Sequence, residues 1–124
     1  MSKGKKIRVH FELLREKFGR KSFGVKVSIQ RGDRQPIIGS IFDLPSAKVA
    51  ESVRDLARQC IAEKISLTLT ERGRGDRESI LIVSFPEIVN DAGEKEISFA
   101  AFDDFRLASK VGNFLKRVSH FGRD

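Results

Sequence analysis

The chain of 124 residues contains no tryptophan, no tyrosine and a single cysteine, and these absences narrow what it can do. One cysteine, Cys60, excludes an intramolecular disulfide and a zinc site built on paired cysteines. Without Trp and Tyr, only Phe and His side chains can stack on nucleic-acid bases. No Gly-x-x-x-x-Gly-Lys loop is present, and Gly73-Arg74-Gly75 lacks the third glycine of a dinucleotide motif. We therefore expect no cofactor and no catalytic activity.

Long apolar runs are missing as well. No segment approaches the roughly 20 apolar residues of a membrane-spanning helix, and the basic residues 1–6 are not followed by the apolar stretch of a signal peptide. We therefore expect no membrane contact and a cytoplasmic or nucleoid-associated location. Cys60 falls on an apolar helical stripe, which predicts a small buried side chain.

One order of predicted elements occurs twice in the chain. Residues 7–63 and residues 65–121 each read as three strands followed by an amphipathic helix. Alternation of apolar and polar side chains predicts the strands, which are 7–13, 23–30, 37–42, 65–70, 80–85 and 97–101. Apolar spacings of three and four predict helices along 49–60 and 107–121. A true duplication and a chance recurrence of this order both remain open.

The predicted fold is α+β. It consists of two pseudo-repeated βββα modules whose antiparallel sheets are backed by the two helices. Neither half is expected to bury enough apolar surface alone, so residues 1–124 should form a single domain with a basic tail at 1–6. Four side chains are candidates to cap the helices. They are Asp43 and Ser46 for the first helix, and Asp103 and Asp104 for the second.

The net charge of +7 is unevenly distributed. Residues 1–64 hold 15 Lys and Arg and 7 Asp and Glu, whereas residues 65–124 hold 9 and 10. The module 7–63 is therefore basic, and the module 65–121 is near neutral. A concentrated positive region is typical of nucleic-acid-binding proteins, because neutralising phosphates releases counterions. A positive segment can also serve solubility alone.

The candidate interface combines an outward sheet face with basic loops. If the apolar strand faces pack on the helices, the polar positions face solvent, and Ser66, Thr68 and Thr70 add hydroxyls to them. For Phe18, in a basic loop, stacking on bases and burial both remain open. For Phe42 and Phe102, at matched strand ends, burial in the core is favoured over stacking. The predicted nucleic-acid-binding residues are Arg8, His10, Arg15, Lys17, Phe18, Arg20, Lys21, Lys26, Arg31, Arg34, Arg72, Arg74 and Arg77.

Two further patterns in the sequence each allow a functional and a purely structural explanation. The segments 31–34 and 74–77 share the letters Arg-Gly-Asp-Arg, which suit either phosphate binding or a solubilising hairpin turn. The acidic stretch 87–104 offers carboxylates for a metal, but Asp103 and Asp104 also suit helix capping and the helix dipole. We expect no metal site, and an acidic face at 87–104 that can receive a protein partner.

The strands 7–13, 23–30 and 37–42, their second set, and the Phe-Asp-to-helix junctions at 42–43 and 102–103 resemble the PUR (purine-rich element binding) family and the Whirly-type fold. The resemblance implies curved sheets that bind single-stranded DNA or RNA. The family unit has four strands before its helix, whereas three are read here. A fourth strand would have to lie in residues 3–6 or 86–95.

These patterns favour a non-catalytic nucleic-acid-binding protein, with single-stranded DNA or RNA preferred over duplex. The alternative is a protein-interaction or adaptor module, from a mobile element, that uses its charge polarity to dock or to assemble. A homodimer is compatible with either function.

Overall fold

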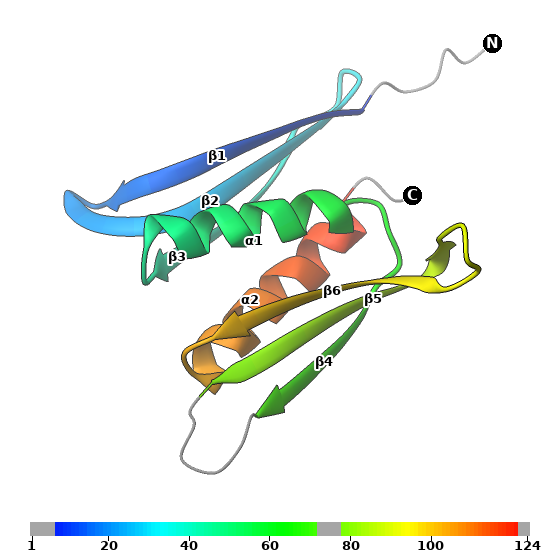
Figure 1. Cartoon of the computed structure of the whole chain (residues 1–124). Coiled ribbons are helices and arrows are strands. Elements are labelled where there is room, and N and C mark those ends of the chain that lie inside the picture. The colour runs from blue at the N-terminus through cyan, green and yellow to red at the C-terminus, as the bar shows by residue number, and fades with distance from the viewer. Residues whose placement is uncertain (1–6, 72–77, 122–124) are drawn as a thin grey trace.

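The computed structural model describes residues 7–71 and 78–121. They form two antiparallel three-stranded sheets and two helices (Figure 1). The first sheet contains β1 (Ile7–Lys17), β2 (Arg20–Arg31) and β3 (Ile37–Leu44), and is followed by α1 (Ala47–Cys60). The second sheet contains β4 (Ser66–Glu71), β5 (Ser79–Val89) and β6 (Lys95–Phe102), and is followed by α2 (Phe105–His120). The predicted α+β fold of two βββα modules is confirmed.

The two helices form a layer between the two sheets (Figure 1). α1 packs against all three strands of the first sheet, α2 packs against β3 and the second sheet, and the helices contact each other. Each sheet therefore has one face on the helices and one outward face, and the two outward faces point away from each other. No helix in the described ranges is both long enough and apolar enough to cross a membrane.

The period of two along each central strand decides which side chains enter the core. Val25, Val27 and Ile29 of β2 are fully buried under the helices, while the residues between them face outward. The corresponding buried residues of β5 are Leu81, Val83 and Phe85. These side chains join the apolar stripes of both helices in one cluster, where Cys60 is fully buried as predicted.

Capping side chains fix where both helices begin. The Ser46 hydroxyl accepts a hydrogen bond from the backbone N–H of Val49, 3.2 Å away, and so caps α1. The Asp104 carboxylate accepts one from the N–H of Leu107, 2.7 Å away, and so caps α2. Asp43, the other candidate to cap α1, lies instead within β3, at a point where the strand pairing is irregular.

That irregularity is a β-bulge in β3 opposite Gly24, where the pairing of β2 and β3 shifts register. Asp43 has a left-handed backbone with φ 60°, and a side chain at Gly24 would collide with the carbonyl oxygen of Ile41. Alternation after the buried Ile41 puts Phe42 on the outward face, and the extra residue of the bulge then turns Leu44 back into the core.

The last four residues of β6, 99–102, are apolar on both faces, so alternation alone does not predict which face packs on the helices. Phe102 faces the helices and is 4% exposed, so the prediction of a core residue is confirmed. Phe42, predicted to share that role, is only half-buried. The alternating apolar residues of β6 face outward; they are Ile97, Phe99 and Ala101.

Each module has three strands within the described ranges. Residues 86–95 do not form a fourth strand, because they continue β5 to Val89 and then turn. The Asn90 side chain holds this turn by accepting hydrogen bonds from the N–H groups of Ala92 (2.9 Å) and Glu94 (3.1 Å). The other segment proposed for a fourth strand, residues 3–6, lies outside the described residues.

Candidate nucleic-acid interface

The outward face of the first sheet carries the polar residues expected there. The register places His10 opposite Ser28, and Glu12 opposite Lys26. Across the next strand pair, Ser28 lies opposite Ile38, an outward side chain that is 54% exposed. The face therefore mixes cations, hydroxyls, the carboxylate of Glu12 and two apolar side chains, Ile38 and Phe42, across three strands. Arg8 lies opposite Gln30 at its far end.

The loop around Phe18 is a tight hairpin between β1 and β2. Lys17 pairs with Arg20, so that Phe18 and Gly19 alone make the turn, and both have positive φ, 53° and 77°. Two positive φ angles are what a type I′ hairpin turn requires. A phenylalanine rarely adopts this conformation, and its side chain here is 94% exposed. The burial alternative for Phe18 is thereby excluded.

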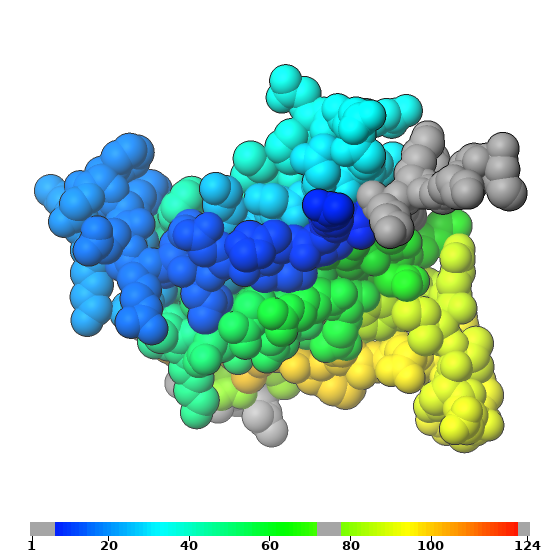
Figure 2. Space-filling model, turned by 90° about the horizontal axis from the view of Figure 1, so that it is seen from above, coloured from blue at the N-terminus to red at the C-terminus, as the bar shows by residue number. Residues whose placement is uncertain are grey.

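Basic side chains surround this exposed ring. A hollow of about 510 Å³ beside the hairpin is lined by Lys17, Phe18, Arg20, Lys21, Ser22 and Asp43. A second hollow, of about 470 Å³, is lined by Arg15, Glu16, Lys21, Phe23 and Ala47. Four of the predicted cations therefore gather within one hairpin, which projects from one end of the molecule in Figure 2 (blue). We call residues 15–21 the basic hairpin.

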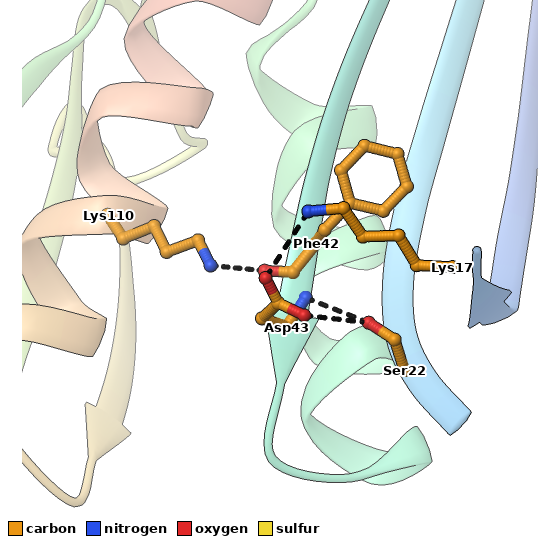
Figure 3. Close-up of polar contacts among 5 residues, drawn as sticks. All are labelled: Lys17, Ser22, Phe42, Asp43 and Lys110. Carbon is orange, nitrogen blue, oxygen red and sulfur yellow. Dashed lines mark hydrogen bonds and ion pairs between the residues drawn. The ribbon is translucent and has the colours of Figure 1, made fainter. Parts of the chain in front are cut away.

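A polar network connects the basic hairpin to the bulge in β3 (Figure 3). The Ser22 hydroxyl donates to the Asp43 carboxylate at 3.1 Å and accepts the backbone N–H of Asp43 at 3.2 Å. Lys17 Nζ lies 3.4 Å from the same carboxylate. The Ser22 hydrogen bond, followed by the nearby Lys17 charge, lowers the pKa of Asp43 below its ordinary value of 3.8. Lys110 of α2 donates to the carbonyl oxygen of Phe42, so the second module also supports this network.

The turn between β2 and β3 lies at the other end of the first sheet. With about 3.3 Å per residue, the 12 residues of β2 separate it from the basic hairpin by roughly 40 Å. Arg31 falls on the helix-facing side of β2, opposite Ile7, whereas Arg34 is exposed. The Gln30 amide donates to the carbonyl oxygens of Gly32 and Arg34, and so orders this turn. Arg31 and Arg34 therefore cannot share one phosphate site with the basic hairpin.

One expectation from the sequence is wrong. The hydroxyls of Ser66, Thr68 and Thr70 were expected on the same surface as the cations of the first module. They lie on the outward face of the second sheet, on the other side of the helix layer, because each module builds its own sheet. The remaining candidates, Arg72, Arg74 and Arg77, lie outside the described residues.

The acidic residues between 87 and 104 occupy two places. Glu87, Asp91, Glu94 and Glu96 lie at or beside the β5–β6 hairpin. Asp103 and Asp104 follow the other end of β6, about 26 Å away for a strand of 8 residues. Within residues 7–71 and 78–121, no cluster of three His, Cys, Asp or Glu side chains is placed to hold a metal ion.

The only thiol of the chain is not available for chemistry in the folded protein. Burial, with a smaller contribution from the charge of Glu63, raises the pKa of the Cys60 thiol to about 12. Because the thiolate is the reactive form, Cys60 is inert near neutral pH.

Three members of the interface are absent from the nucleic-acid-binding residues predicted from the sequence. They are Ser22, Phe42 and Asp43, and they meet only because the bulge in β3 brings the end of that strand beside the basic hairpin. The one available signal was Gly24 within an otherwise apolar alternation, which is typical of a bulge or a close backbone approach.

No protein-family model matches this chain, and no curated protein or solved structure matches it. The resemblance to the PUR family therefore stays a prediction, and the functional argument rests on the geometry of the chain itself.

Proposed function

We propose that the protein binds single-stranded nucleic acid, without chemistry, through the basic hairpin and the adjoining outward face of the first sheet. The observation that carries the proposal is the Phe18 ring, which is 94% exposed at the tip of a hairpin and flanked by Lys17 and Arg20. An aromatic ring for a base beside cations for phosphates is the combination that single-strand binding proteins use.

The charges of the basic hairpin suit a phosphate backbone. The basic hairpin has four cations, and only two carboxylates, Glu16 and Asp43, lie in or beside it. Lys17 already forms an ion pair with Asp43. Arg20 and Lys21 are exposed and border a hollow beside the ring. We assign them the principal phosphate contacts, and we assign further backbone contacts along the sheet to Lys26 and Arg8.

Single-stranded nucleic acid is preferred over duplex because the exposed Phe18 ring can stack only on a base that is not already stacked. Bases in a duplex are already stacked on their neighbours, so a protruding Phe18 gains a partner only where a base is free. The open face of three strands is also wide enough for an extended strand to lie across it. Sites of this kind hold about 4–16 nucleotides.

One observation favours the alternative function of a protein-interaction or adaptor module. The basic hairpin and the β5–β6 hairpin, which carries Asp91 and Glu94, project at opposite ends of the molecule (Figures 1 and 2). Opposite charges at opposite ends suit docking to a charged partner or assembly head to tail.

A fluorescence anisotropy titration separates the two functions. A labelled single-stranded oligonucleotide is titrated with the protein at low and at moderate salt, with duplex of the same sequence as competitor. The proposal expects binding at low salt that weakens as salt rises and that duplex displaces poorly. No binding at low salt would reject nucleic-acid binding and favour the adaptor function.

A further inference from the structure

The outward face of the second sheet differs in composition from the outward face of the first. Over the regularly paired stretches 66–70, 80–84 and 97–101, nine side chains point outward and none is charged; Lys95, the next outward position of β6, lies at the end of this area. The nine side chains are Ser66, Thr68, Thr70, Ile80, Ile82, Ser84, Ile97, Phe99 and Ala101. We call these nine residues the neutral face. With 33% of all residues charged, about three of nine would be expected to carry a charge.

The equivalent positions of the first sheet provide the comparison. They are Arg8, His10, Glu12, Lys26, Ser28, Gln30, Ile38, Ser40 and Phe42. Both sets occupy the same place in a βββα module, so packing against the helices does not explain the difference. On the neutral face, Phe99 is 67% exposed and Ile97 is 50% exposed, with Ile80 and Ile82 half-buried between them and β4. The apolar side chains of β5 and β6 lie together, with hydroxyls beside them along β4, and an apolar patch bordered by polar groups is a candidate interaction surface.

We propose that the neutral face is covered by the neutral face of a second copy of this chain. In a twofold symmetric dimer each patch meets itself, so a charged patch would place like charges together, whereas an uncharged one does not. Two such sheets can pack face to face about 10 Å apart, as in a β-sandwich.

The charge distribution supports this arrangement. Each chain carries a net charge of +7, so two copies repel unless their cations stay apart. The first sheet lies beyond the helix layer, and a helix is about 10–12 Å thick, more than the screening length of about 8 Å at physiological salt. Contact through the neutral face therefore leaves both basic hairpins on the outside, where they remain accessible.

The size of the face sets the strength of the dimer. With about 3.3 Å per residue and 4.8 Å between strands, the neutral face measures about 20 Å by 14 Å. A groove of about 600 Å³ between α1 and β6 adjoins it, because Phe99 and Ala101 line both. Stable complexes bury about 800 Å² per partner, which exceeds this face. The dimer should therefore be weak and should appear only as concentration rises.

Sedimentation equilibrium over a range from micromolar to millimolar protein tests the proposal. The wild-type chain should pass from monomer to dimer, without the loss of association at high salt that an ionic contact shows. Phe99→Glu should leave the melting temperature nearly unchanged, because the side chain is mostly exposed, and should abolish the dimer. The matched control is Ile38→Glu, the same kind of change on the outward face of the first sheet, which should leave the dimer intact.

Mixing two variants gives a stricter test. Phe99→Glu and Phe99→Lys should each be monomeric alone and should form a mixed dimer when combined, because opposite charges then share one interface. A wild-type monomer at every concentration, or a dimer that survives Phe99→Glu, would overturn the proposal. A monomer whose oligonucleotide affinity falls on Phe99→Glu would overturn it too, and would assign the neutral face to bases.

Discussion

The ammonium group of Lys17 lies 4.8 Å from the centre of the Phe42 ring, although the two residues belong to strands that do not pair with each other. The Lys17 side chain reaches past β2 to the outward face of β3, where it also forms an ion pair with Asp43. Such cation–π contacts contribute about 0.5–1 kcal/mol at exposed sites. The contact holds the base of the basic hairpin against the sheet, so that the hairpin and the sheet face can act as one surface.

Removing two cations from the basic hairpin should weaken nucleic-acid binding and its dependence on salt. Arg20→Ala with Lys21→Ala deletes the two assigned phosphate contacts, and the slope of log K against log salt should become shallower by up to about 1.4. Anisotropy titrations at several salt concentrations measure it. The control, Lys48→Ala with Lys116→Ala, removes the same charge from exposed helix positions and should change the slope little. An unchanged slope in the hairpin variant would remove these residues from the interface.

Replacing Phe18 should make the protein more stable and less able to bind. Asn tolerates the positive φ at this position, so Phe18→Asn should raise the free energy of unfolding by up to about 1 kcal/mol. The loss of stacking should lower affinity by about 1–3 kcal/mol per base. Thermal unfolding and anisotropy measure the two effects. Ala62→Asn, at φ 62°, is the control, since it relieves similar strain far from the hairpin and should stabilise without affecting affinity.

Neutralising Asp43 should strengthen binding. Asp43→Asn keeps an acceptor for Ser22 and a residue that tolerates positive φ, but releases Lys17 for phosphate. Affinity should rise several-fold at low salt, whereas Asp91→Asn, at the opposite end of the molecule, should have a smaller effect. Equal gains from both variants would mean that only net charge matters.

The lowered pKa of Asp43 should make the stability of the protein depend on pH in the acid range. Because the pKa of Asp43 is lower in the folded protein, Asp43 contributes stability above pH 3.8, and this contribution is lost as pH falls through the lowered folded value. Acid unfolding followed by circular dichroism should therefore be less steep in Asp43→Asn. A wild-type-like acid transition in that variant would contradict the assignment.

Cys60 should report global unfolding. Its pKa of about 12 lies above the ordinary value of 9.0, so the folded state favours the neutral thiol, and its contribution to stability is lost as pH rises from about 9 to 12. Cys60→Ala should remove this part of the alkaline destabilisation. In the wild type at pH 8, a thiol reagent should label Cys60 only after denaturant is added. Rapid labelling of the native protein would show that the site opens.

Replacing Gly24 and Gly112 by alanine should have opposite effects on the stability of the protein. Gly24→Ala forces a side chain against the Ile41 carbonyl at the bulge and should lower the free energy of unfolding by about 1–3 kcal/mol. Gly112→Ala on α2 meets only Leu81 and Leu67 side chains at 3.5 and 3.7 Å and should be neutral or stabilising. Chemical denaturation of both variants compares them. Equal stabilities would show that the bulge does not require glycine.

The periodicity of the sequence was enough to predict the strands, the helices and their order, because alternation and helical spacing are local patterns. The central strands were the clearest, since Val25, Val27 and Ile29 alternate with polar residues and only one orientation buries them. The gathering of cations near Phe18 was predictable too, since the residues are neighbours in the chain.

Relations between distant segments were not predictable. The sequence does not show that each module forms a separate sheet, so Thr68 and Lys26 were placed on one surface although they lie on opposite sides of the helices. The single extra residue of the bulge in β3 turns Leu44 into the core, where strict alternation would face it outward. Residues 99–102 of β6 are apolar on both faces, and only tertiary packing decides that Phe102 enters the core and Phe99 does not.

The most direct test of the central claim is the salt dependence of binding to a short single-stranded oligonucleotide, measured by fluorescence anisotropy with the wild-type protein. If the four assigned phosphate contacts, Arg20, Lys21, Lys26 and Arg8, all form, log K should fall against log salt with a slope of about −3. Duplex should compete poorly, and Phe18→Ala should weaken binding without changing the slope. No binding at low salt, or a slope near zero, would contradict the account.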